Sequence, residues 1–93
     1  MAKVIVKGFI VVSDTDLEVV EQALPAHLAL TLEEEGCLCF QVVKCPSNAN
    51  RFDVYEEFVD MEAFNFHQER IKDSHWGSVT KSVERHYTID QPE

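Results

Sequence analysis

The sequence predicts an α+β domain in which one four-stranded antiparallel sheet carries its helices on a single face. Runs rich in β-branched and aromatic residues alternate with two longer stretches of helical periodicity. Two of the strand-like runs are separated only by a turn, which indicates a hairpin. A chain of 93 residues corresponds to one domain. We therefore expect a single domain over residues 1–93, with a core at about 3–90 and a frayed tail at 91–93.

The first predicted strand covers residues 3–12, KVIVKGFIVV. Its two alternating sets of side chains are both largely apolar: Val4, Val6, Ile10 and Val12 on one side, and Ile5, Phe9 and Val11 on the other. A strand that is apolar on both sides must be covered on both sides.

A long helix is predicted next, because the segment SDTD supplies N-capping residues. Apolar or small side chains then repeat at helical spacing: Leu17, Val20, Leu24, Leu28 and Thr31. The acidic run 33–35 leads into Gly36, a natural helix stop. Pro25 lies well inside this helix and should kink it.

The second and third strands are predicted over residues 37–44 and 51–59, joined by the turn PSNAN. Asp60 is a suitable N-cap for a second helix that runs to about Lys72. These elements follow the first strand and helix directly, without a linker or a repeat.

Asp73 or Ser74 can cap a short third helix, and residues 85–90 (RHYTID) form the fourth predicted strand. The order β-α-β-β-α-α-β is the split βαβ, ferredoxin-like arrangement, an α+β fold.

The charge balance narrows the classes of partner. The net charge is −9, from 17 acidic against 8 basic residues, and no basic run is present. Nucleic acid and anionic membranes both attract Lys/Arg-rich surfaces, so neither is an expected partner. No segment reads as a membrane span or a targeting signal, and we expect a cytoplasmic protein. A small neutral aromatic ligand remains compatible.

The three cysteines are Cys37, Cys39 and Cys45. Cys37 and Cys39 lie two apart in a predicted strand, where side chains point the same way but strain opposes a disulfide. Reduced thiols are expected. A zinc site that combines the three cysteines with a histidine is a weak alternative, because the spacing differs from paired zinc knuckles.

The helices of this arrangement cover only one face of the sheet. The other face would carry Phe, Leu and Val side chains into water, and contiguous apolar patches of that size are rare on monomers. We therefore predict a homodimer that packs sheet against sheet, with a pocket between each sheet and its own helices.

Two motifs now carry a family resemblance: EEEGCLCFQVV at the junction of the first helix and second strand, and FDVYEEFVDMEAFNFH at the third strand and second helix. Together, and over roughly residues 3–90, the chain resembles the antibiotic biosynthesis monooxygenase family. The resemblance implies a dimeric α+β barrel and oxygenation of quinols or related polyphenols by O2 without metal, flavin or other cofactor. The haem-degrading relatives share the fold but use an Asn on the first strand and a Trp on the second helix. Lys7, Gly8 and His67 stand at those places here, so haem degradation is not expected.

Oxygenation without a cofactor requires a base that takes a proton from the phenol, an apolar enclosure and a donor to the developing charge. His67 follows Phe64 by three residues and precedes Ile71 by four, which places it on their inward stripe. Its ordinary pKa near 6.5 suits a base. The alternative is a packing histidine that is satisfied by a backbone carbonyl or by Glu56.

Trp76 is the second candidate catalytic residue, because its indole N–H can donate to a substrate oxygen. The predicted substrate-binding residues are His27, Phe64, Phe40 and Tyr87. Packing is the alternative for Trp76 and Tyr87, and for His27 local packing near Pro25 is slightly favoured.

Glu56 shares a strand face with apolar side chains, which is unusual for a carboxylate. We favour a hydrogen-bonded position at the dimer interface over a role in orienting a pocket histidine. Arg70 is expected to face solvent or to pair with one of the many glutamates.

The sequence thus favours a monooxygenase that acts on a quinol or polyphenol. A module that binds or senses a small aromatic metabolite without reaction is the alternative. A third hypothesis is detoxification of a reactive aldehyde or quinone, with Cys37 or Cys39 as the thiol.

Overall fold

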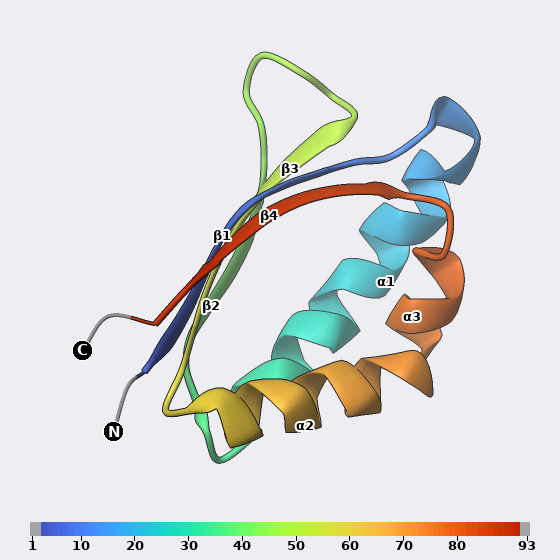
Figure 1. The fold of residues 1–93 in the computed structure, drawn as a ribbon. Coiled ribbons are helices and arrows are strands. Elements are labelled where there is room, and N and C mark those ends of the chain that lie inside the picture. The colour runs from blue at the N-terminus through green and yellow to red at the C-terminus, as the bar shows by residue number, and fades with distance from the viewer. Residues whose placement is uncertain (1–2, 92–93) are drawn as a thin grey trace.

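The computed structural model describes residues 3–91 and has the predicted order of elements (Figure 1). The elements are β1 (Val4–Val11), α1 (Asp14–Leu32), β2 (Cys37–Lys44), β3 (Arg51–Phe58), α2 (Met61–Lys72), α3 (His75–Val79) and β4 (Glu84–Asp90). The strands form one antiparallel sheet in the order β2-β3-β1-β4. The predicted α+β, ferredoxin-like fold is confirmed.

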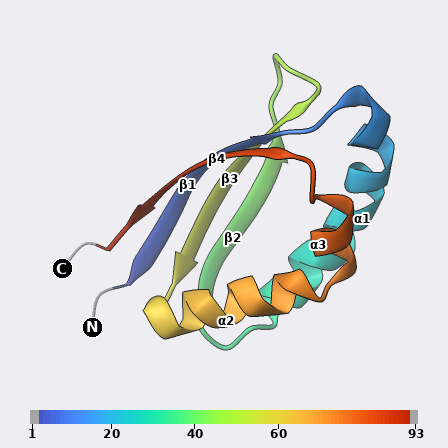
Figure 2. The same ribbon diagram turned by 45° about the vertical axis from the view of Figure 1, so that its right-hand side comes forward.

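The molecule has two layers, with the sheet on one side and all three helices on the other (Figures 1 and 2). The strand residues that face the helices form the core, and Val4, Val6 and Ile10 of β1 are at most 2% exposed. Phe52 and Phe58 of β3 are buried to the same degree. The apolar set Val4, Val6, Ile10 and Val12 is therefore the core set, as the alternation predicts.

Capping side chains set the start of the two shorter helices. Asp60 Oδ1 accepts a hydrogen bond from the Ala63 amide at 2.9 Å, and Ser74 Oγ accepts one from the Gly77 amide at 3.0 Å. Ser13 occupies the N-cap of α1 but makes no side-chain cap bond. α1 continues through Pro25 to Leu32.

Gly8 brings β4 unusually close to β1. Its φ of +155° is a conformation that side chains rarely adopt, and a Cβ at this position would lie 1.9 Å from the backbone oxygen of His86. The β1–β4 pairing next to Tyr87 therefore depends on a residue without a side chain.

A register shift in β2 corrects one prediction about the cysteines. Cys37 pairs with the buried Phe58, whereas Cys39 pairs with Glu57 of the opposite sheet face. The expectation that the two thiols point the same way is wrong, because Leu38 is an extra residue at a β-bulge and reverses the alternation. All three cysteines are free thiols.

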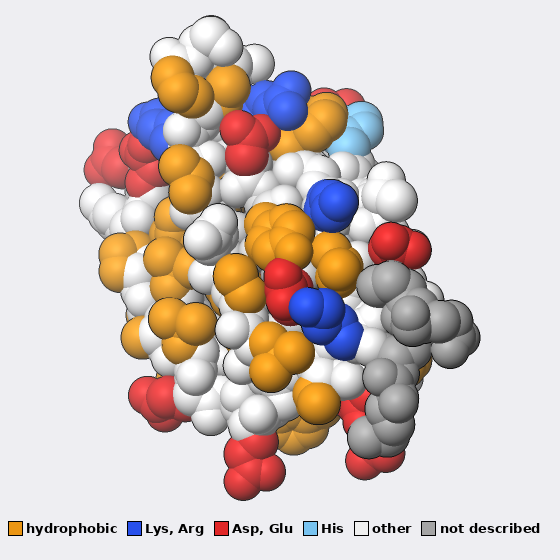
Figure 3. Space-filling model, turned by 90° about the vertical axis from the view of Figure 1, so that its left-hand side faces the viewer, with side chains coloured by type: hydrophobic (Ala, Val, Ile, Leu, Met, Phe, Trp, Pro, Cys, Tyr) orange, Lys and Arg blue, Asp and Glu red, His pale blue; other side chains and the backbone are white. Residues whose placement is uncertain are grey.

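The sheet face away from the helices is a mixture of apolar and charged groups (Figure 3). Its apolar members include Ile5, Phe9 and Val43. Charged side chains lie among them, and the guanidinium of Arg51 sits 3.9 Å from the centre of the Phe9 ring. This face is apolar in part, as expected, but it is more polar than the pattern of β1 alone predicts.

No helix within residues 3–91 combines the length and apolar character needed to cross a membrane.

Candidate functional site

A cavity of about 280 Å³ lies between the helix-facing side of the sheet and the helices. Its walls come from every strand and every helix of the fold. A larger groove of about 730 Å³ lies on the outer surface, at the end of α1 and along α2. The smaller cavity is the candidate site, because histidines, a carboxylate and aromatic rings converge there.

All six predicted site residues line this one cavity: His27, Phe40, Phe64, His67, Trp76 and Tyr87. They come from α1, β2, α2, α3 and β4, so only the folded chain brings them together. The structure establishes their positions, and their catalytic or binding roles remain predictions.

His67 lies at the buried end of the cavity and is 1% exposed. It lies next to two aromatic side chains, with ring centroids 5.0 Å from Phe58 and 5.5 Å from Phe40. Its helical spacing from Phe64 points it at the sheet, as predicted. A titratable ring in this apolar setting is destabilised when charged, and burial accordingly lowers the pKa of His67 below its ordinary value of 6.5.

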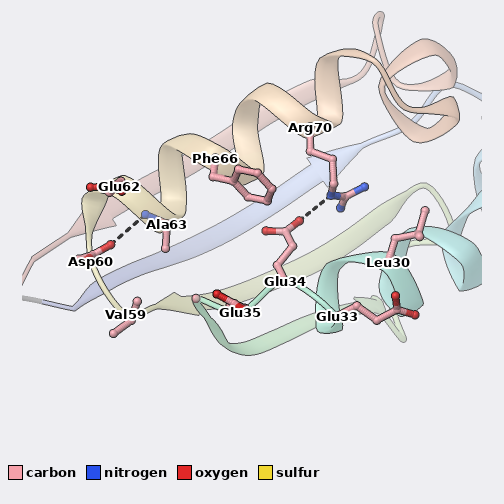
Figure 4. Close-up of a pocket in the computed structure, with 11 residues that line it drawn as sticks. Leu30, Glu33, Glu34, Glu35, Val59, Asp60, Glu62, Ala63, Phe66 and Arg70 are labelled. Atoms are coloured by element: carbon pink, nitrogen blue, oxygen red, sulfur yellow. Dashed lines mark hydrogen bonds and ion pairs between the residues drawn. The ribbon is translucent and has the colours of Figure 1, made fainter.

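Glu34 fixes the orientation of the His67 ring. Its Oε2 accepts a hydrogen bond from His67 Nδ1 at 2.9 Å. The same oxygen accepts one from Arg70 Nε at 2.6 Å, which Figure 4 shows. Arg70 also donates to the hydroxyl of Thr31 at 2.9 Å. Because Nδ1 carries the hydrogen in this arrangement, Nε2 is the free basic nitrogen of the neutral ring. The hydrogen bond that His67 donates to Glu34 partly offsets the effect of burial on the pKa of His67.

Glu56 lies on the other side of the ring, with Oε1 3.9 Å from His67 Nε2. It is 6% exposed and lines the cavity. Burial, together with the nearby charge of Glu34, raises the pKa of Glu56 to about 7. The preferred expectation for Glu56 is therefore wrong: it faces the helices, not the outer sheet face, because it shares the face of Phe52 and Val54.

His27 stacks on Trp76, with ring centroids 4.5 Å apart and an angle of 5° between the planes. It is 3% exposed, and its Nδ1 has no hydrogen-bond partner within the described residues. Burial, with the charges of His67 and Arg70, lowers the pKa of His27 to about 3. His27 is therefore a neutral wall of the cavity at physiological pH, and its role in substrate binding stays a prediction.

The accessible end of the cavity is formed by β4 and the second half of α2. Tyr87 is 40% exposed and Ile89 is 51% exposed, although both line the cavity. Desolvation and the charge of Glu56 raise the pKa of the Tyr87 phenol to about 12, so it stays protonated and can donate. A ligand that enters between β4 and Lys72 would meet Tyr87 first and His67 last.

The histidines and cysteines outside this set have other roles. His86 stacks on Phe9 on the outer face of the sheet, and His75 is exposed. Burial raises the pKa of the Cys37 thiol, as does the charge of Glu34, so its reactive thiolate is disfavoured. Among residues 3–91 no three metal-binding side chains converge.

Glu34 is the contact of His67 that sequence reasoning missed, whereas the contact of Glu56 with His67 was the less favoured of the two alternatives for Glu56. Glu34 lies in the acidic run that we interpreted only as a helix stop. The spacing His27, Thr31, Glu34 is i, i+4, i+7, so Glu34 continues the buried stripe of α1 just past the end of the helix, and all three are buried. That stripe was the available signal. The prediction that Arg70 pairs with a glutamate is confirmed.

Comparisons with known proteins agree with this architecture. A candidate oxidoreductase of unknown function from Bacteroides thetaiotaomicron superposes with a TM-score of 0.77 at 18% identity, over 97% of each chain. Candidate antibiotic biosynthesis monooxygenases from Nitrosomonas europaea and Deinococcus radiodurans each give a TM-score of 0.75. Their identities are 16% and 20%, over 98% and 97% of this chain and 89% and 92% of theirs. At these identities the likeness shows the fold alone.

No curated protein matches the chain. The family model described as antibiotic biosynthesis monooxygenase matches residues 4–75, which contain α1, α2 and the first three strands. That match covers most of the chain and agrees with the resemblance carried by the two sequence motifs. The chain belongs to the antibiotic biosynthesis monooxygenase family, and this membership supports a monooxygenase-like role.

Proposed function

We propose that the protein is a monooxygenase that oxidises a small quinol or polyphenol with O2, without metal or flavin, and that His67 is its base. The observation that carries the proposal is the fixed ring of His67, whose Nδ1 is held by Glu34 while Nε2 faces Glu56 and the cavity. A histidine oriented by a carboxylate is a recurrent arrangement for taking a proton from a hydroxyl group.

The overall reaction balances without a further reactant. A quinol and O2 give a hydroxylated quinone and water, so one oxygen atom enters the ring and the other leaves as water. His67 Nε2 takes the phenolic proton, and the anion passes one electron to O2. The resulting superoxide and semiquinone combine to form a C–O bond. Cleavage of the O–O bond then expels water as the ring loses a proton.

This sequence needs two groups that exchange protons near neutral pH, one for the phenol and one for the ring proton. His67 and Glu56 lie 3.9 Å apart at the cavity wall, and the pKa of Glu56 is raised to about 7. A group with a pKa near the working pH can both accept and return a proton. The pair therefore supplies the base and the second proton acceptor.

The size and lining of the cavity suit a small aromatic substrate. Its volume of about 280 Å³ lies just under the usual range of about 300–1,000 Å³ for ligand sites. Phe40, Phe64 and the His27–Trp76 stack provide flat apolar walls, while the Tyr87 hydroxyl can donate to an oxygen at the open end.

The test is oxygen uptake with a menadiol-type quinol under air, measured together with the absorbance of the product. We expect wild type to accelerate oxidation above the rate without protein. His67→Ala should lose about 10²- to 10⁴-fold of that acceleration, the usual contribution of a general base. Glu34→Gln should also slow the reaction, whereas Glu35→Gln, an exposed neighbour, is the matched control and should not.

A binding module for an aromatic metabolite is the second candidate, and it is favoured by the deep burial of both cavity histidines. Wild-type rates equal to autoxidation, with saturable quinol binding that His67→Ala does not abolish, would establish that function and overturn the oxygenase. Loss of activity in Cys37→Ser or Cys39→Ser, with His67→Ala unaffected, would instead support the thiol hypothesis.

A further inference from the structure

The outer groove is distinct from the internal cavity and has a different chemistry. It runs between the end of α1 and the exposed side of α2, and Figure 4 shows its lining side chains. Leu30, Val59 and Phe66 contribute apolar surface and are 50%, 41% and 60% exposed. Exposed apolar side chains gathered in a hollow commonly mark a contact surface for another molecule.

The rim of the groove is strongly acidic. Five carboxylates line it: Glu33, Glu34, Glu35, Asp60 and Glu62. Arg70 is the one basic side chain in the lining, and its charge is already engaged by Glu34 at 2.6 Å. The groove therefore offers a concentrated negative potential beside an apolar floor.

One of these carboxylates also has an unused acceptor. Glu34 is 9% exposed, and its Oε2 receives both His67 and Arg70, but its Oε1 is buried without a hydrogen-bond partner in the described residues. In Figure 4 this second oxygen is turned away from Arg70, on the side of Phe66. A buried acceptor without a donor is costly, so the position favours a donor brought by another molecule.

We propose that this groove binds a short basic segment of a partner protein, with an apolar side chain against Phe66 and Lys or Arg side chains against the acidic rim. An amphipathic basic segment matches both features, because its apolar residues fill a groove while its cations meet the flanking carboxylates. Local opening at Phe66 would let one cation reach Glu34 Oε1.

A second copy of this chain is a poor occupant by comparison. Its net charge is −9, so two copies repel each other at an acidic surface. Within residues 3–91, five basic side chains already sit in ion pairs: Lys3, Lys44, Arg51, Arg70 and Lys72. Within the same residues Lys7, Lys81 and Arg85 lie outside these ion pairs, against five carboxylates in the groove, so a partner richer in cations than this chain is the better match.

The experiment titrates the full chain with two synthetic peptides of about twelve residues, both designed as amphipathic helices. One combines leucine with lysine, and the other carries glutamate in place of each lysine. Binding is measured by calorimetry at about 0.15 M salt, where long-range attraction is largely screened. We expect saturable binding of the lysine peptide and none of the glutamate peptide.

Matched variants separate the groove from general charge attraction. Glu33→Gln and Glu62→Gln should each weaken binding about two- to fivefold, whereas Glu18→Gln and Glu84→Gln, which remove the same charge elsewhere, should leave it unchanged. Phe66→Ser should weaken it about tenfold, and Val19→Ser, an exposed residue outside the groove, should not. Circular dichroism checks that each variant is folded.

Three results would overturn the proposal: equal binding of the two peptides, equal losses in the groove and control variants, or no binding of the lysine peptide at millimolar concentration. A further readout connects the groove to the internal site. Because Glu34 contacts both the groove and His67, the ring resonances of His67 should shift when the lysine peptide binds, and those of the exposed His75 should not.

Discussion

His67 owes its character to two carboxylates that differ in their own environment. Glu34 forms an ion pair with Arg70 at 2.6 Å and accepts the hydrogen bond from His67 Nδ1. Among the described residues Glu56 forms no ion pair with a Lys or Arg side chain, and its pKa is raised to about 7. One histidine thus lies between a carboxylate paired with Arg70 and a carboxylate whose pKa is raised to about 7.

This difference predicts a pH effect on stability. Between pH 4.5 and 7 the folded protein keeps the Glu56 proton while the unfolded chain has lost it, so the folded state binds more protons and stability falls as pH rises. Glu56→Gln removes this loss of stability, because glutamine does not titrate. We expect the variant to gain on the order of 3 kcal/mol over wild type between pH 4.5 and 8, measured by urea unfolding at each pH.

The difference in unfolding free energy between wild type and Glu56→Gln separates the contribution of Glu56 from those of the histidines. His27, whose pKa is lowered to about 3, contributes the opposite slope between pH 3 and 6.5, and it does so in both proteins. The groups that face Glu56 from other elements are His67 of α2 and Tyr87 of β4, together with Glu34 after α1. A stability difference that stays constant with pH would mean that Glu56 titrates at its ordinary pKa.

The orientation of His67 could be predicted from the sequence, but its hydrogen-bond partner could not. The inward position of His67 followed from its spacing with Phe64, because helix geometry fixes which side chains share a face. Its partner Glu34 lies 33 residues away at the end of another helix. Only the tertiary fold, which places the turn after α1 beside α2, brings the two together, and no local pattern encodes that contact.

At the scale of elements, the caps were the most reliable signals. Asp60 and Ser74 begin α2 and α3 as predicted, since a side-chain acceptor at that position satisfies a free helix amide. The bulge at Leu38 had no such signal. It depends on how β2 pairs with β3, and a one-residue shift there moves Cys39 to the opposite face.

Two serines at N-caps allow a direct test of how much a side-chain cap stabilises the fold. Ser74 Oγ accepts from the Gly77 amide at 3.0 Å and donates to the Ile71 carbonyl at 2.8 Å, whereas Ser13 makes no cap bond. We expect Ser74→Ala to lower the free energy of unfolding by about 1 kcal/mol and Ser13→Ala to have a smaller effect. Urea denaturation of both variants measures the difference, and equal losses would contradict the assigned caps.

At the scale of the whole molecule, the helices leave one face of the sheet uncovered. The expected oligomeric state depends on the side chains of this face. Ile5, Phe9, Val11 and Tyr55 are only half-buried there, in a domain too small to bury most of its surface. Charged residues interrupt the patch, yet Arg51 lies over Phe9 and pairs with Asp53, so part of that charge is neutralised locally. The arrangement fits an interface with an apolar centre and polar surroundings.

We therefore predict a homodimer that buries this outer face and leaves the internal cavity of each subunit intact. Light scattering at micromolar concentration should give about twice the chain mass of 10.7 kDa. Val43 lies on the outer face of β2 and is 58% exposed, so Val43→Glu should shift the protein toward monomer without unfolding it, because a buried unpaired charge opposes association. Val19→Glu, on the helical side, is the matched control and should leave the mass unchanged. A wild-type monomer, or a dimer that Val19→Glu disrupts and Val43→Glu does not, would place the interface elsewhere and remove the argument from the uncovered sheet.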